Sequence, residues 1–231
     1  MRLLVPFAAA ALALAYAAAP AGSSTNSASG CGDRAYTYAG FAGARRAHGV
    51  SAAITALAAP EVANGHVAAW VGVGGPGEGP HGTDEWLQVG ISGFSDHSAL
   101  YYEVAQPGAA PEYVEVLPAL APGERHRVTV LEMYRRPGWW RVFVDHRPMT
   151  APIHLAGSHG RWQPIATAES WNGGTRACNA FAYRFGRVRS ATAPGGGWKR
   201  FKTGYRFQDR GYKLIRVARA SFIARADFSS S

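Results

Sequence analysis

Hydrophobic and polar residues alternate along many short stretches of the chain, most clearly in residues 84–91. As an extended strand, this stretch places its aliphatic residues on one face and Trp86 and Gln88 on the other, because successive side chains point to opposite sides. A second stretch, residues 165–171, places Glu169 on the face opposite its alanines. If both strands lie in one sheet, Gln88 and Glu169 project together from an aromatic surface.

The same alternation predicts many further short strands separated by Gly- and Pro-rich turns. Tyr36 and Tyr38 indicate an edge strand, and residues 50–59 favour a strand through Ile54-Thr55, although their alanines favour a helix. The other predicted strands cover residues 68–73, 99–105, 113–117, 126–134, 139–144, 153–155, 180–188 and 214–223. No stretch has a long helical period. We therefore expect an all-β antiparallel sandwich or barrel.

The composition is that of a globular protein, with 47% hydrophobic and 17% charged residues in a chain of 231. This length fits one domain with a substantial core. The formal net charge of +9 permits contact with a polyanion but does not specify a fold. Much of this charge lies in residues 199–219, where basic and aromatic residues are interleaved. This C-terminal segment either contacts polyanions or forms a basic hairpin that covers the sandwich.

Residues 1–21 resemble a secretory signal peptide, with Arg2 before an apolar run and small residues at the candidate cleavage sites. A membrane anchor is the alternative, but a Gly- and Ser-rich linker, residues 22–34, follows at once. We expect a secreted monomer without a membrane span in its mature form, and one folded domain over residues 35–231. Because an exported chain with two cysteines usually forms one disulfide, we expect a bond between Cys31 and Cys178.

Four short motifs carry a resemblance to a known family. They are Trp70-Val71-Gly72-Val73-Gly74, Leu87-Gln88-Val89-Gly90, Tyr101-Tyr102-Glu103 and Ala168-Glu169-Ser170-Trp171. In this order they resemble the eqolisin family of glutamic peptidases. In that family the tryptophan follows the glutamate directly, whereas here Ser170 separates Glu169 from Trp171. The resemblance implies a concanavalin A-like sandwich of two curved sheets and a secreted enzyme that acts on peptide bonds.

Matched by motif, Gln88 takes the place of the family's catalytic glutamine and Glu169 that of its catalytic glutamate. A carboxylate can act as general base toward water, and a neutral amide can stabilise an oxyanion. The residues implied to line the substrate cleft are Trp70, Trp86, Tyr101, Glu103 and Trp171. The chemistry needs no cofactor. We expect no metal site, since the eight histidines show no ligand spacing.

Two alternatives remain open at this stage. Gln88 and Glu169 are also typical of polar residues on a solvated sheet face. In that case the aromatic residues favour a secreted, non-catalytic binding module for a carbohydrate or cell-wall polymer. The expected partner is therefore a polypeptide substrate or a polysaccharide.

Overall fold

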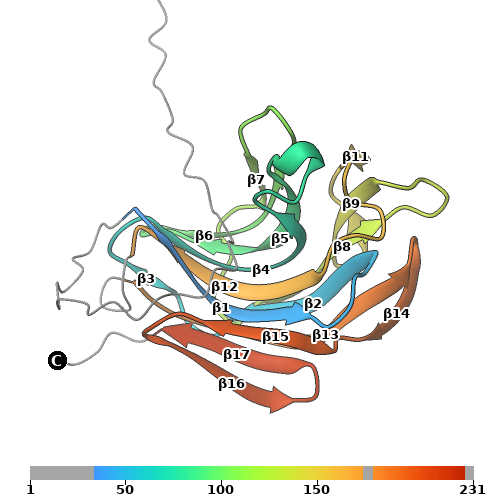
Figure 1. Ribbon diagram of the computed structural model, residues 1–231. Helices are drawn as coiled ribbons and strands as arrows, with labels where there is room; N and C mark the ends of the chain where they lie inside the picture. Colours follow the sequence, from blue (N-terminus) through green and yellow to red (C-terminus); the bar gives the residue numbers. More distant parts are fainter. Residues whose placement is uncertain (1–33, 174–178, 227–231) are drawn as a thin grey trace, which may run out of the picture.

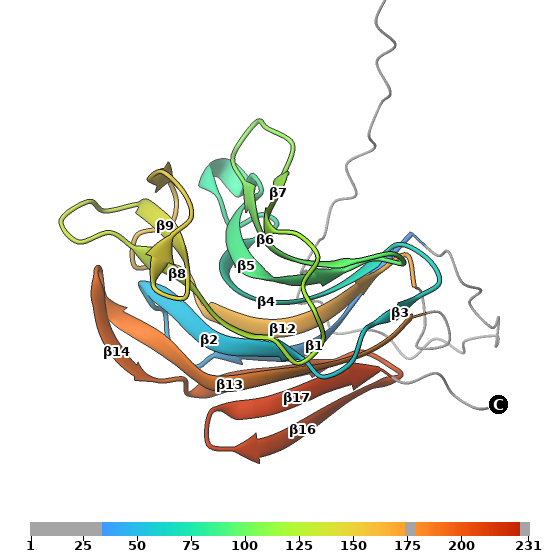
Figure 2. The same ribbon diagram turned by 180° about the vertical axis from the view of Figure 1, so that it is seen from behind.

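The computed structural model describes residues 34–173 and 179–226 (Figure 1). Within these residues every regular element is a β-strand except η1 (Pro80–Gly82), a short 3₁₀ turn. The strands form two sheets in which all pairings are antiparallel. The long strands of both sheets bow in the same direction, as Figures 1 and 2 show from opposite sides. The predicted all-β sandwich is confirmed.

The first sheet carries both predicted catalytic residues. Its strands are β1 (Tyr36–Gly43), β4 (His66–Gly75), β5 (Glu85–Gly93), β6 (Ser98–Ala105), β7 (Glu112–Leu117), β12 (Pro164–Trp171) and β15 (Thr203–Gln208). They form a seven-stranded sheet in the order β15-β1-β12-β4-β5-β6-β7. Strand β4 therefore separates β5, which carries Gln88, from β12, which carries Glu169.

The second sheet has ten strands. They are β2 (Gly49–Ala56), β3 (Glu61–Val62), β8 (Arg125–Glu132), β9 (Trp139–Val144), β10 (Arg147–Pro148), β11 (Ile153–His154), β13 (Asn179–Ala193), β14 (Gly196–Arg200), β16 (Tyr212–Ala218) and β17 (Ser221–Ala226). The main order is β10-β9-β8-β2-β13-β17-β16, with β11 paired to β9 and both β3 and β14 paired to β13.

The hydrophobic core fills the space between the two sheets. Val71 and Val89 from the first sheet and Ile54, Trp140 and Phe185 from the second are each at most 1% exposed and belong to one cluster. Because side chains alternate along a strand, the residues between these core positions point outward from the sandwich. Each sheet thus presents one outer face on which polar and aromatic side chains can gather.

Three local predictions differ from the structure. Tyr36 and Tyr38 lie on β1, which is not an edge strand, because it pairs with both β12 and β15. The predicted strand 214–223 is two strands, β16 and β17, joined by a tight turn in which Ala220 has a φ of 57°. The basic segment 199–219 does not form one unit, since β14 and β16 join the second sheet and β15 joins the first.

Three expectations, the signal peptide, the linker and the disulfide, fall wholly or partly outside the described residues. The signal peptide, residues 1–21, and the linker up to residue 33 lie there, as do Cys31 and Cys178. In the ranges that the structure covers, there is no helix long and apolar enough to cross a membrane.

Candidate active site

Gln88 and Glu169 both project from the outer face of the seven-stranded sheet. Gln88 on β5 pairs with Gly72 of β4, and Glu169 on β12 pairs with Ala68 of the same strand. Trp70 stands between these two positions on β4 and shares their face. Although neither side chain is part of the core between the sheets, Gln88 is only 7% exposed and Glu169 only 5%. Neighbouring side chains on the outer face must therefore cover them.

Glu169 is a buried carboxyl group with one fixed oxygen. The indole Nε1 of Trp70 donates a hydrogen bond of 2.8 Å to Glu169 Oε2. Burial raises the pKa of Glu169 to about 8, because the charged form loses its hydration. The hydrogen bond from Trp70 opposes this shift, and the negative charge of Glu103 adds to it. Glu169 therefore carries its proton at neutral pH and can lose it a little above.

Gln88 is held by a hydroxyl group from the next strand. Its Nε2 donates to Tyr101 Oη at 3.1 Å. A primary amide has two N–H donors, so one remains for another acceptor. Tyr101 is itself 1% exposed, and burial, followed by the charges of Glu169 and Glu103, raises its pKa well above the ordinary value. Its hydroxyl group thus stays protonated and gives Gln88 a fixed orientation.

A glycine separates the rings of Trp70 and Tyr101. Gly90 pairs with Trp70 on one side and with Tyr101 on the other. A β-carbon at Gly90 would lie 1.9 Å from the carbonyl oxygen of Ala69, so this pairing leaves no room for a side chain. Trp70 and Tyr101 pack in one small cluster on the outer face. The Gly90 position of the sequence motif thus has a steric reason.

A second carboxyl group lies beside Gln88. Glu103 on β6 is directly opposite Gln88, and its Oε1 accepts a hydrogen bond of 3.1 Å from the indole Nε1 of Trp86. Burial raises the pKa of Glu103, and the bond from Trp86 partly offsets this. The outer face therefore holds two tryptophan–carboxylate pairs, Trp70 with Glu169 and Trp86 with Glu103, on either side of Gln88.

Aromatic rings from outside the motifs complete this surface. Tyr36 on β1 packs on Trp171 with ring centroids 4.6 Å apart, and Tyr113 on β7 stacks on Tyr101 at 5.0 Å. His66, whose pKa burial lowers to about 4, has its ring 6.0 Å from that of Tyr36. None of these three residues belongs to the site predicted from the sequence. The one sequence signal among them is the alternation of Tyr36 and Tyr38 with small residues. It predicts a strand but not which strands lie beside it.

The structure brings the predicted residues to one face in pairs. Trp70 contacts Glu169, Tyr101 contacts Gln88, and Trp86 contacts Glu103, while Trp171 lies two residues beyond Glu169 on the same strand. The indole N–H groups of Trp70 and Trp86 each hold one carboxyl group in a fixed position. The catalytic and substrate-binding roles of these residues stay predictions.

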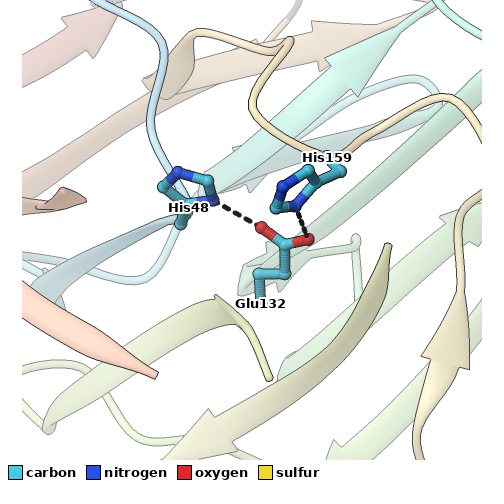
Figure 3. Close-up of side chains that lie close together, drawn as sticks. All are labelled: His48, Glu132 and His159. Carbon is cyan, nitrogen blue, oxygen red and sulfur yellow. Dashed lines mark hydrogen bonds and ion pairs between the residues drawn. The ribbon is translucent and has the colours of Figure 1, made fainter. Parts of the chain in front are cut away.

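A separate cluster of His48, Glu132 and His159 is shown in Figure 3. Their ligand-type atoms lie within 4.8 Å of one another, so they could approach a metal ion. However, the Nδ1 atoms of His48 and His159 lie 2.5 and 2.7 Å from the carboxylate oxygens of Glu132. These are hydrogen-bond distances, shorter than the roughly 3.4 Å between two ligand atoms of a tetrahedral zinc ion. The backbone N–H of Gly138 also donates to Glu132, at 2.6 Å. We interpret the cluster as a hydrogen-bonded anchor that joins three loops.

Comparison with known proteins gives matches to solved structures alone. No family model matches the chain, and no curated protein sequence matches it. A crystal structure of scytalido-glutamic peptidase with a peptide-based transition-state analogue matches with a TM-score of 0.51 and 15% identity, covering 83% of this chain and 98% of that one. A second structure of scytalido-glutamic peptidase, with a transition-state analogue inhibitor, has a TM-score of 0.52 and 11% identity, covering 84% and 98%.

The chain has the glutamic peptidase fold. The two matches cover 98% of scytalido-glutamic peptidase and at least 83% of this chain, so the two proteins share the sandwich fold. At this level of identity the similarity concerns the fold. Activity has to be argued from the side chains of this chain.

Proposed function

We propose that this chain is a secreted glutamic endopeptidase that hydrolyses peptide bonds. In this proposal Glu169 is the acid–base group and Gln88 is the oxyanion donor. One observation carries it. Glu169 and Gln88 emerge from the same outer face, each almost completely covered, and each is held by a neighbouring aromatic side chain. The glutamic peptidase fold supports the proposal.

The ionised form of Glu169 acts first, as general base. It takes a proton from a water molecule while the water oxygen attacks the scissile carbonyl carbon. The resulting tetrahedral intermediate has one new C–O bond and a negative oxygen. Glu169, now protonated, returns the proton to the leaving amide nitrogen, and the C–N bond breaks. A pKa of about 8 suits both transfers, because a group that titrates close to the working pH can accept and return a proton readily.

Trp70 determines which carboxyl oxygen does this work. Its indole N–H is bound to Oε2 of Glu169, so we assign the water and the mobile proton to Oε1. The same hydrogen bond stabilises the ionised form and keeps the pKa of Glu169 lower than burial alone would set it. Trp70 is therefore a positioning residue with a measurable effect on the titration of the base.

Gln88 stabilises the negative oxygen of the intermediate. One of its two N–H groups is bound to Tyr101, and we assign the other to the oxyanion. Because the amide is fixed before the substrate arrives, little reorganisation accompanies the reaction. Removing one such donor typically reduces transition-state stabilisation by about 3 kcal/mol, which corresponds to roughly a hundredfold decrease in kcat.

The aromatic surface gives the substrate a place to bind. Rings such as Tyr36, Tyr113 and Trp171 offer apolar area beside the polar groups, which suits peptide side chains flanking the cleaved bond. Scytalido-glutamic peptidase, which shares the fold, was crystallised with a peptide-based transition-state analogue. This agreement supports a polypeptide as the substrate class.

The test is cleavage of a denatured protein between pH 2 and 10. We expect Glu169→Gln to abolish turnover and Gln88→Ala to reduce kcat about a hundredfold. Glu112→Gln, which removes an exposed carboxyl group from β7, is the control and should cleave as well as wild type. Chelators and reagents for serine or cysteine should not inhibit. If wild type cleaves nothing over this range, the interpretation as a non-catalytic carbohydrate-binding module replaces the peptidase.

A further inference from the structure

A basic groove lies on the outer face of the ten-stranded sheet, on the side of the sandwich opposite Gln88 and Glu169. It has a volume of about 1040 Å³ and is formed by strands β2, β8 and β13 together with the turn between β16 and β17. Four arginines line it: Arg125, Arg127, Arg184 and Arg187. Its floor is made of small residues, including Ala53 and Thr55 of β2. We call it the arginine groove.

The strand register arranges these arginines in two rows. Thr55 pairs with Arg125 on one side and with Arg184 on the other, so two arginines flank it. Ala53 pairs with Arg127 in the same way. Since strands lie about 4.8 Å apart, the two sides of a row are separated by roughly 10 Å. Successive rows follow each other at about 7 Å, the length of two residues of a strand.

A β-bulge adds the fourth arginine. The pairing of β13 with β2 shifts between Gly186 and Arg189, and Arg187 adopts a φ of 51°, which residues other than glycine rarely do. The hydroxyl group of Ser221 accepts a hydrogen bond of 3.0 Å from the Arg187 backbone N–H. Val188 returns to the core, so the bulge turns Arg187 outward beside Gly186. Without the bulge the second row would have an arginine on one side only.

The protein neutralises the positive charge of the groove only in part. Among the residues that the structure describes, Asp145 is the one carboxylate that lines it, and it accepts hydrogen bonds from the Arg127 backbone N–H and from His126, both at 2.8 Å. Across the described ranges, no ion pair joins any of the four guanidinium groups to a carboxylate. Burial lowers the pKa of Arg127, the nearby charges of Arg187, Arg189 and Arg125 lower it further, and the charge of Asp145 opposes this. The four charges therefore repel one another in the absence of an anion.

We propose that the arginine groove binds an acidic polysaccharide. Each planar guanidinium group can bind a carboxylate or sulfate with two parallel hydrogen bonds, and two rows of arginines can hold successive charged units of a linear chain. The small floor leaves room for sugar rings, and hydroxyl groups such as that of Thr55 can bind sugar hydroxyls. None of the described residues that line the groove is Trp, Tyr or Phe. Proteins that bind single-stranded nucleic acid combine a basic groove with such stacking rings, so this groove fits a polymer without bases.

The test measures binding of fluorescently labelled polymers to the full chain by anisotropy. The probes are heparin, polygalacturonate, uncharged dextran and a single-stranded oligonucleotide. We expect heparin or polygalacturonate to bind, dextran not to bind, and the oligonucleotide to bind at least tenfold more weakly. Because ionic contacts release counterions, affinity should fall steeply with salt.

Two variants with equal net charge separate the groove from general basicity. In the groove variant, Arg125, Arg127, Arg184 and Arg187 are changed to Gln, and affinity should fall at least a hundredfold with a shallower salt dependence. In the control, four exposed residues of the basic C-terminal segment are changed to Gln, namely Lys199, Arg200, Lys202 and Arg210. The control should lose less than threefold. Equal loss in both variants would overturn the proposal, as would tighter binding of the oligonucleotide or no binding of either acidic polymer.

A single substitution keeps the test valid if the fourfold variant does not fold. Arg187→Gly removes one guanidinium group while glycine accepts the positive φ more easily than arginine does. It should therefore retain or raise the melting temperature and still weaken polymer binding about fivefold. Unchanged affinity in this variant, with folding intact, would contradict a role for the bulge.

Discussion

Replacing Glu169 by Gln should make the protein more stable at neutral and alkaline pH. The pKa of Glu169 is about 8 in the folded protein, whereas in an unfolded chain it is near the ordinary glutamate value of 4.5. Between these pH values the folded state binds one proton more than the unfolded state. Wild-type stability therefore falls as pH rises through this window. Glutamine has no proton to lose, and it can still accept the hydrogen bond from Trp70.

The magnitude follows from the two pKa values. One unit corresponds to 1.36 kcal/mol, so the interval from 4.5 to about 8 gives on the order of 5 kcal/mol. At pH 4 the ionisation of Glu169 should not distinguish the variant from wild type. At pH 9 the free energy of unfolding of the variant should exceed that of wild type by several kcal/mol, and the difference should not grow further.

Urea unfolding followed by tryptophan fluorescence at pH 4, 6, 8 and 9 measures this difference. Glu112→Gln serves as the control, because it makes the same chemical change at an exposed carboxyl group of β7. Taking the difference between variant and wild type cancels the titration of every group that does not interact with Glu169. If the difference for Glu169→Gln stays constant from pH 4 to 9, the buried, protonated state of Glu169 is refuted.

Two further substitutions test the packing of the sandwich. Glu132→Gln should destabilise by about 2–4 kcal/mol at pH 7, since it removes the charge that accepts hydrogen bonds from His48, His159 and a backbone N–H. Burial raises the pKa of Glu132, but these hydrogen bonds hold it below the ordinary value of 4.5. The stability that ionised Glu132 contributes is therefore lost as pH falls below 4.5, and the difference between Glu132→Gln and wild type should shrink there. Gly90→Ala should destabilise the protein by about 3 kcal/mol, because the added β-carbon meets a backbone oxygen. Gly186→Ala is its control and should remain within about 1 kcal/mol of wild type, because the atom nearest to its added β-carbon lies 3.6 Å away. Chemical unfolding measures both.

The strands that carry the candidate site could be predicted because their signal is local. In β5 and β12 alternate residues belong to the core between the sheets, as the sequence pattern predicts, although nearly every residue of both strands is buried. Which strands become neighbours is not encoded in this alternation. The alternation around Tyr36 therefore predicts a strand correctly. It does not predict that the ring of Tyr36 packs on that of Trp171, with the two ring centroids 4.6 Å apart.

Features assembled from distant segments could not be predicted from the sequence. The arginine groove combines residues of β8 and β13, and its bulge at Arg187 has no glycine at the position of positive φ. The turn at Ala220 likewise lacks the glycine, asparagine or proline that usually indicates a turn. The anchor at Glu132 joins His48, 84 residues earlier, to His159, 27 residues later. At these separations no short motif in the sequence indicates that the three side chains meet.

The pH dependence of kcat/KM for peptide cleavage tests the central claim most directly. Because the base is active when ionised, wild-type activity should rise with pH to a plateau, with an inflection near pH 8. Trp70→Phe removes the hydrogen bond that stabilises the ionised carboxylate, so its inflection should move to higher pH. Glu169→Gln should show no turnover at any pH. Turnover by Glu169→Gln equal to that of wild type, or a Trp70→Phe profile that coincides with it, would contradict the assignment of Glu169 as the acid–base group.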